Sequence, residues 1–276
     1  MKFRKVEGSK RIGCVQDLIN EIHSIRGRNL GREGGFPLWF RGQSDSKNYR
    51  LVPAIGREHK YNGKSLNGFP ISSERSVLDR FRRHAYPYVN NRLMSEWEAL
   101  LLARHHGLPT RLLDWTYSPL AALFFACTDH FKLDGEIWAI TKHDGNEHFI
   151  NVVSAGPSDK GPFEYGGSAR VRQKRKCPDA VKIVVGFDVS PRIQMQRGIF
   201  TLHSNPFKQL DSYAGAEFQK GLLDVSCLYH WIIKAEKKAV IINELEEMGI
   251  NTRMFFPDLD GLAKELWQTE VLRTGN

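Results

Sequence analysis

Polar residues with the chemistry of a binding or catalytic site lie between apolar segments in one stretch, Ser95–Asp129. They are His105, Arg111 and Asp114, with His106 beside the first of them. A guanidinium binds phosphate or carboxylate through two parallel hydrogen bonds, and an imidazole transfers protons near neutral pH. Polar groups among apolar neighbours need partners, so the sequence predicts a site here.

A further candidate, Arg41, lies earlier in the chain. Leu38 and Phe40 alternate with Trp39 and Arg41, which predicts a short strand that presents Arg41 on one face. Gly42 then lets the backbone turn or lets a ligand approach closely. Taken alone, Arg41 is better explained as a solvated arginine at a strand end.

Two interpretations of the central polar residues stay open at this point. Arg111 and Asp114 can form a buried ion pair that pins their segment, or they can bind a ligand. A single histidine in a helix, such as His105, is more often a core or surface residue than a catalyst.

The helix that precedes Arg111 has clear boundaries in the sequence. Ser95 and Glu98 form a capping box, which predicts a helix that begins at Glu96. Gly107 supplies the left-handed position that ends a helix, and Pro109 prevents its continuation. The polar candidates His105 and Arg111 therefore lie on either side of a helix end.

The segment that follows carries Asp114 between two elements. Residues 110–115 are short and predicted to be extended. Ser118 followed by Pro119 is an N-cap with proline at the first helical position. Residues 120–126 are apolar on every side, so this second helix is expected to be buried.

Outside this stretch, hydrophobic periodicity predicts both helices and strands. Helices are expected over 14–25, 73–85, 237–248 and 258–267. Strands are expected over 136–140, 181–189, 199–202, 228–234 and 252–256. Loops are expected over 1–13, which we predict to be flexible, over 44–69, and over 143–180, a loop-rich insertion in a single domain of 276 residues.

The composition is basic, with 40 Lys+Arg against 31 Asp+Glu and a formal charge of +9. This excess favours polyanionic partners, nucleic acid first; a merely soluble basic protein is the alternative. Basic residues crowd into one short run: Arg170, Arg172, Lys174, Arg175 and Lys176. That run is either a solvated loop or a nucleic-acid-binding one.

Metal and redox chemistry are not predicted. The four cysteines, Cys14, Cys127, Cys177 and Cys227, are far apart and make no ligand spacing, so we expect free thiols in a reducing compartment. Adjacent histidines on a helix point about 100° apart and cannot chelate one metal. The N-terminus has no apolar signal region, and no apolar run is long enough to span a membrane, so a cytoplasmic location is expected.

Several familiar enzyme motifs are missing from the sequence. There is no GxxxxGK[ST] phosphate loop, no GxGxxG after a strand, no HExxH and no GxSxG. The chemistry of the polar residues must therefore come from another kind of site.

Three segments together resemble the FRG domain, a bacterial family named for the Phe-Arg-Gly found here at 40–42. They are WFRGQ at 39–43, HHGLPTRLLDWT at 105–116 and SPLAALFFA at 118–126. QRGIF at 196–200 and FPDLDGL at 256–262 also match the pattern, so the resemblance extends from about residue 15 to 267. Arg104 and His106 depart from it, since Gln and Tyr are commoner there, which favours His105 as the functional histidine.

A second similarity, at the level of the fold, is to ADP-ribosyltransferases. It implies an α+β fold in which a mixed or antiparallel split sheet forms a sandwich with flanking helices and clamps NAD. In those enzymes an arginine on the first strand holds the NAD phosphates. A glutamate on a late strand stabilises the oxocarbenium-like transition state.

Carried onto this sequence, the resemblance implies that Arg41 binds the pyrophosphate, because guanidinium matches phosphate geometry. Gly42, Gln43, Thr110 and Trp115 are the other residues expected to bind the cofactor, with Trp115 packing on nicotinamide.

The resemblance also implies catalytic roles for residues of the central stretch. His105, Arg111 and Asp114 would form the polar floor of the site. Gln196 takes the late position and would orient the ribose. It is not a carboxylate, so Glu217 and Glu236 are alternatives for the missing charge.

The sequence-level hypothesis is therefore an NAD-dependent ADP-ribosyltransferase-like toxin. It would modify RNA or DNA in bacterial toxin–antitoxin or anti-phage defence, with an antitoxin or immunity protein as a possible partner. One alternative is a nucleic-acid-binding or nuclease-like module that uses no NAD. Another is a non-catalytic interaction domain with a structural Arg111–Asp114 pair.

Overall fold

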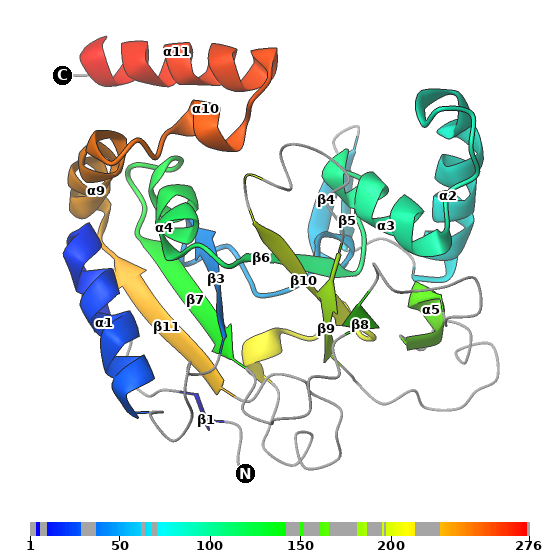
Figure 1. Cartoon of the computed structure of the whole chain (residues 1–276), viewed down its shortest axis with the longest axis horizontal. Helices are drawn as coiled ribbons and strands as arrows, with labels where there is room; N and C mark the ends of the chain where they lie inside the picture. The colour runs from blue at the N-terminus through cyan, green and yellow to red at the C-terminus, as the bar shows by residue number, and fades with distance from the viewer. Residues whose placement is uncertain are drawn as a thin grey trace.

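The computed structural model describes residues 4–5, 10–28, 37–61, 64–67, 71–141, 150–151, 161–165, 181–186, 195, 197–212 and 227–274. These residues form one mixed sheet with helices packed on it (Figure 1). The chain therefore has the predicted α+β class.

Nine strands form the sheet in the described part of the chain. They are β1 (Arg4–Lys5), β2 (Lys10–Ile12), β3 (Leu38–Gln43), β6 (Leu112–Thr116), β7 (Gly135–Thr141), β8 (Ile150–Asn151), β9 (Val181–Val185), β10 (Gly198–His203) and β11 (Cys227–Ile233). Their order is β1-β11-β7-β3-β6-β10-β9-β8, with β2 also on β11. The central pairs are antiparallel, whereas β1 and β2 on β11, and β8 on β9, are parallel.

The sheet is split between β3 and β6. Strand β3 pairs with β7 over its whole length, and β6 pairs with β10 in the same way. Between β3 and β6, however, a single pair, Phe40 and Thr116, is in register. Thr116 is the last residue of β6, so the two half-sheets meet at the end of β6 and separate along the rest of β3 and β6.

Helices cover the two half-sheets separately (Figure 1). On the β3–β7–β11 half lie α1 (Val15–Arg28), α4 (Pro119–Cys127) and α9 (Ala235–Glu247). Beside the β6–β10–β9 half lie α2 (Ile71–His84), α3 (Glu96–His105) and α5 (Pro162–Tyr165). The helices α10 (Thr252–Phe255) and α11 (Leu259–Thr274) complete the chain next to α4 and α9.

Three hydrophobic clusters follow from this arrangement. Phe40 and Ile137 pack against α4 in the first cluster, and Leu112 and Phe200 pack against α3 in the second. Successive strand residues point to opposite faces, so Trp39 belongs to a third cluster on the other face of the sheet. The two helix-side clusters, one under α4 and one under α3, are therefore distinct.

Most predicted elements are confirmed, including the boundaries around the central stretch. Ser95 accepts a hydrogen bond from Glu98 N, and Glu98 returns one from Ser95 N, as a capping box requires. Gly107 has φ 82°, and Ser118 caps α4. These ends were predictable because they depend on local backbone hydrogen bonds alone.

The strand predicted over 252–256 is wrong. Thr252–Phe255 is the short helix α10, and Asn251 Oδ1 accepts a hydrogen bond from Met254 N at 3.0 Å. Asparagine is a strong N-cap, and this cap outweighs the strand preference of the aromatic residues that follow.

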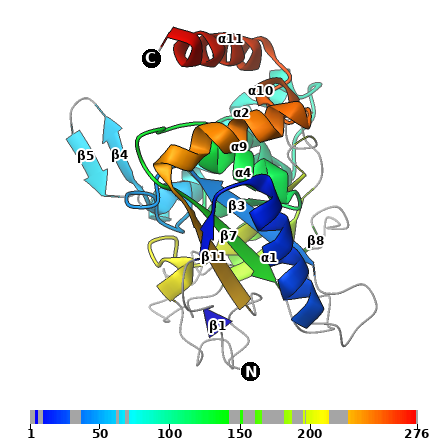
Figure 2. The same cartoon turned by 90° about the vertical axis from the view of Figure 1, so that its left-hand side faces the viewer.

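Segments predicted to be loops contain short elements as well. In the N-terminal segment, β1 and β2 pair with β11, and β8 and α5 lie within 143–180. Between residues 44 and 69 lie a 3-10 turn, Ala54–Gly56, and the hairpin β4 (Glu58–Tyr61) and β5 (Lys64–Asn67), which stands apart from the main sheet (Figure 2). Such short strands depend on a partner strand, so the local sequence does not predict them.

Among the helices of the described residues, none has the length and apolar character needed to cross a membrane.

Candidate functional site

A cavity of about 520 Å³ opens where β3 and β6 diverge. Its walls come from β3, β6, α3, α4 and the start of β10. Six of the residues predicted from the sequence line it: Arg41, Gly42, Gln43, His105, Asp114 and Trp115. The divergence of the half-sheets thus brings together β3, α3 and β6, which are far apart in sequence.

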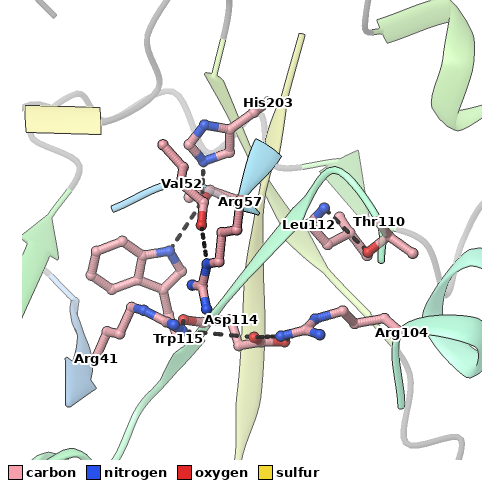
Figure 3. A network of polar contacts seen from close by, with 10 residues as sticks. Arg41, Val52, Arg57, Arg104, Thr110, Leu112, Asp114, Trp115 and His203 are labelled. Carbon is pink, nitrogen blue, oxygen red and sulfur yellow. Dashed lines mark hydrogen bonds and ion pairs between the residues drawn. The ribbon is translucent and has the colours of Figure 1, made fainter. Parts of the chain in front are cut away.

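Arginines converge on the Asp114 carboxylate inside this cavity (Figure 3). Arg104 Nε donates to Asp114 Oδ1 at 3.1 Å, and Arg104 Nη2 donates to Oδ2. Arg41 Nη1 donates to the backbone oxygen of Asp114 at 2.9 Å and lies 3.7 Å from Oδ2. Burial opposes ionisation, but Arg104, and then Arg41 and Arg57, hold the pKa of Asp114 below its usual value.

Positive charge exceeds negative charge around Asp114. Burial, and next the charge of Arg57, lower the pKa of Arg41 to about 9. Burial, and next Arg104, also lower the pKa of Arg57. Arg104 and Arg41 therefore contact one carboxylate while Arg57 adds a third positive charge nearby, and burial leaves Arg41 and Arg57 poorly solvated by water.

Two of these guanidinium groups present buried donors. Arg57 Nε donates to Val52 O at 3.1 Å, but Arg57 Nη2 has no acceptor among the described residues. The same holds for Arg41 Nε. A buried donor without an acceptor is costly, and here two such donors belong to residues that line one cavity.

The predicted ion pair between Arg111 and Asp114 is wrong. Arg111 is wholly buried and pairs with Glu74 of α2, at 2.8 Å from Nε and 2.5 Å from Nη2. Arg111 lies just before β6, whereas Asp114 lies within it, and the two side chains have different partners. Arg111 does not line the cavity, and neither does Thr110.

Gly42 is needed for packing. A Cβ at this position would lie 1.8 Å from the backbone oxygen of Ala122 and 2.8 Å from Ala126 N, both in α4. The glycine therefore lets α4 lie directly on β3. The expected ligand approach is a separate possibility, since Gly42 also belongs to the cavity lining.

Other predicted residues fall elsewhere. Gln196, Glu217 and the basic residues Arg170, Arg172, Lys174 and Arg175 lie outside the described residues. Glu236 is on α9 and does not line the cavity. The carboxylates on the described cavity wall are those of Asp114 and Asp129.

Sequence reasoning missed Arg57 and Arg104. Arg104 lies on α3 and entered the sequence analysis only as a departure from the family pattern. Arg57 follows the 3-10 turn in a segment predicted to be loop. The length of that segment was the signal, because long connections in compact domains are often functional.

Cys127 and Cys14 are free cysteines, and Cys127 lies in the core, where burial raises the pKa of its thiol to about 12. In the part of the chain that the structure describes, no group of three or more His, Cys, Asp or Glu side chains could hold a metal ion.

A family model of the FRG domain matches residues 37–135. Residues 37–135 form an FRG domain. This range contains β3, α3, β6 and α4, and also the connection that carries Arg57. All three arginines and Asp114 lie within it. The wall formed by Gly198 and Phe200 of β10 comes from outside it. No curated protein and no solved structure matches the chain.

Next to the cavity, a chain of hydrogen bonds fixes the side chain of Trp115. Its Nε1 donates to Thr201 Oγ1 at 3.0 Å, and Thr201 Oγ1 lies 3.0 Å from His203 Nε2 (Figure 3). Burial, and then Arg111 and Arg41, lower the pKa of His203 to about 3. His203 is therefore neutral in the folded protein, with Nε2 available to accept from the Thr201 hydroxyl.

We expect His203 to make the protein less stable in acid. Between pH 6.5 and about 3, the unfolded chain binds a proton on this histidine and the folded chain does not. The free energy of unfolding should therefore fall as the pH falls through this range, by about 1.4 kcal/mol per unit from this group. Urea denaturation at a series of pH values measures it.

The control for this prediction is His23, which is exposed on α1. The steep decline between pH 6 and 4.5 should be reduced in His203→Gln and kept in His23→Gln. An unchanged pH dependence in His203→Gln would show that another group causes the acid sensitivity.

Proposed function

We propose that the cavity between β3 and β6 binds the pyrophosphate of NAD, and that the protein is an ADP-ribosyltransferase-like enzyme. The observation that carries this proposal is that Arg41, Arg57 and Arg104 line one cavity around a single carboxylate, Asp114, which Arg41 and Arg104 contact. Such an excess of partly buried guanidinium charge suits a ligand with several anionic oxygens.

The unused donors favour phosphate in particular. Arg41 Nε and Arg57 Nη2 are buried donors on the arginines of the cavity, and phosphate oxygens accept hydrogen bonds from such groups. A bound phosphate would also stabilise the charged form of Arg41, whose pKa burial lowers to about 9.

The rest of the lining suits a nucleotide. A cavity of about 520 Å³ lies within the range of about 300–1,000 Å³ typical of small-molecule sites. Aromatic side chains line it beside the arginines: Phe40, Tyr49, Trp115, Phe125 and Phe200. Planar bases and the nicotinamide ring pack well on such surfaces, and Trp115 is held in place by Thr201.

In the proposed reaction, the bond between nicotinamide and ribose breaks and nicotinamide leaves with the electron pair. The positive charge that develops on the ribose is stabilised by negative charge nearby, for which Asp114 and Asp129 are candidates on the described wall. The acceptor then bonds to the ribose carbon and loses a proton, which His105 on the cavity wall can accept. Gln196 stays a hypothesis for orienting the ribose.

The proposed acceptor is nucleic acid, because the chain has a formal charge of +9. Modification of RNA or DNA by a bacterial enzyme of this kind suits a toxin in toxin–antitoxin or anti-phage defence. The basic run that includes Arg170, Arg172, Lys174 and Arg175 is the proposed nucleic-acid-binding segment.

Arg41→Ala should lower the release of nicotinamide from NAD by about 100-fold or more, because charge-assisted bidentate contacts contribute about 1.5–3 kcal/mol each. The measurement is nicotinamide release by the purified protein, with and without added RNA or DNA. Arg92→Ala is the matched control, since Arg92 is exposed and pairs with Glu98 on the surface.

Full NAD turnover in Arg41→Ala would overturn the proposal. Tight, salt-sensitive nucleic-acid binding by a folded wild-type protein that releases no nicotinamide would instead favour the nucleic-acid-binding or nuclease-like module.

A further inference from the structure

Gln43, the last residue of β3, presents an unusual side chain in the cavity wall. It lines the cavity and is only 3% exposed. Neither Oε1 nor Nε2 has a hydrogen-bond partner among the described residues. A buried amide without partners is destabilising, so its presence needs an explanation other than stability.

The position of Gln43 relates it to the arginines. It lies two residues after Arg41 on the same strand, so the two side chains point to the same face, about 7 Å apart along the strand. A ligand held by Arg41 can therefore reach Gln43 with a neighbouring group.

A phosphate group alone cannot satisfy both polar atoms of Gln43. Nε2 is a donor and Oε1 is an acceptor, whereas a phosphate oxygen only accepts. Satisfying both atoms requires an N–H donor beside an acceptor. The two planar groups of NAD have such an edge: the carboxamide of nicotinamide and the N6/N7 edge of adenine, which glutamine binds bidentately in nucleic acids.

Planar surfaces lie close to this end of the cavity. Ser44 follows Gln43 and its Oγ lies 3.0 Å from His130 Nδ1. The ring of His130 packs edge-on against Tyr49, at 5.7 Å between centroids, and Tyr49 lines the cavity. Phe125 of α4 lines the cavity as well. A ligand ring whose edge contacts Gln43 could therefore pack its face against Tyr49 or Phe125.

We propose that Gln43 is a specificity-determining residue of the cavity and binds a planar edge with adjacent N–H donor and acceptor, carried by the nucleotide whose phosphates Arg41 holds. This inference rests on the proposed NAD function and deepens it. The arginines would bind the charged phosphates, and Gln43 would recognise the ring that the nucleotide carries.

The test compares Gln43→Met with wild type by calorimetric titration. Methionine keeps the length of the side chain and removes both hydrogen-bonding atoms. We expect NAD to bind about 10- to 100-fold more weakly, since two hydrogen bonds in a buried site are lost. Pyrophosphate alone should bind as it does to wild type. The melting temperature should stay the same or rise, because an unpaired buried amide is removed.

Two shorter ligands, each carrying one part of NAD, show whether the nicotinamide carboxamide or adenine contacts Gln43. Weaker binding of nicotinamide mononucleotide, with ADP-ribose unaffected, identifies the nicotinamide carboxamide. The opposite pattern identifies adenine, and both patterns support the proposal. Gln16→Met is the matched control, because Gln16 is exposed on α1 and bonds to Asn20.

Three results would overturn the inference. They are unchanged NAD affinity in Gln43→Met, an equal loss of pyrophosphate binding, and a marked fall in melting temperature. If Arg41→Ala weakens pyrophosphate and NAD while Gln43→Met changes nothing, the inference fails and the proposed function stands. If the wild-type protein binds neither NAD nor pyrophosphate, both fail.

Discussion

Glu74→Ala should lower the free energy of unfolding by about 3–5 kcal/mol, the usual cost of removing one partner from a buried ion pair. The Arg111 side chain is wholly buried and that of Glu74 is 3% exposed. Glu74 accepts hydrogen bonds from Arg111 Nε, Nη2 and the backbone N. Without the carboxylate, the guanidinium would stay buried over the Phe163 ring with its main counter-charge gone. Urea denaturation followed by circular dichroism measures the change.

The control for Glu74 is Glu96, which pairs with Arg75 at the surface. Glu96→Ala should cost less than about 1 kcal/mol, as exposed pairs do. The double variant Glu74→Leu with Arg111→Met should recover much of the loss, because it removes both charges. A cost below about 1 kcal/mol for Glu74→Ala would mean that the pair does not hold α2 against β6.

This pair also changes the test of the non-catalytic interpretation. That hypothesis assigned the structural role to Arg111 and Asp114, whereas the buried structural pair is Arg111 with Glu74. Asp114 belongs to the cavity and contacts Arg104 and Arg41. Loss of stability at Arg111 therefore says nothing against ligand binding at Asp114.

Gly42→Ala should destabilise the protein by about 3 kcal/mol or more, since the added methyl group overpacks a backbone contact. The new Cβ would lie 1.8 Å from the Ala122 backbone oxygen, so α4 or β3 must move. The expected measurement is a large drop in the midpoint of thermal or urea unfolding.

Gly13→Ala is the matched control for Gly42. A Cβ there meets Asp17 Oδ2 at 3.4 Å, an ordinary van der Waals distance, and little effect is expected. A Gly42→Ala protein as stable as wild type would show that α4 does not rest on β3 as described.

The four residues that follow Trp39 have separate roles. Phe40 fills the cluster under α4, and Arg41 on the opposite face carries charge into the cavity. Gly42 allows α4 to approach, and Gln43 ends the strand with an unpaired amide. The alternation of a strand explains why one short motif serves both packing and binding.

The sequence by itself determined the local structure around the site. The capping box at Ser95, the left-handed Gly107 and the N-cap at Ser118 depend on hydrogen bonds within a few residues, and all are present. Hydrophobic periodicity also predicted β3, β7 and β11, because their side chains alternate or are continuously apolar. Residue types alone placed Arg41, His105 and Asp114 among the candidates that line the cavity.

Only the tertiary structure decided which charges meet. Arg111 and Asp114 are near in sequence, yet Arg111 pairs with Glu74 of α2 and Asp114 with Arg104 of α3. Arg57 reaches the cavity from a connection between β3 and α2 whose path no local pattern sets. The cavity itself exists because β3 and β6 share a single pair in register. Such long-range pairing depends on the packing of the whole chain, and so it cannot be obtained from the order of residues along one segment.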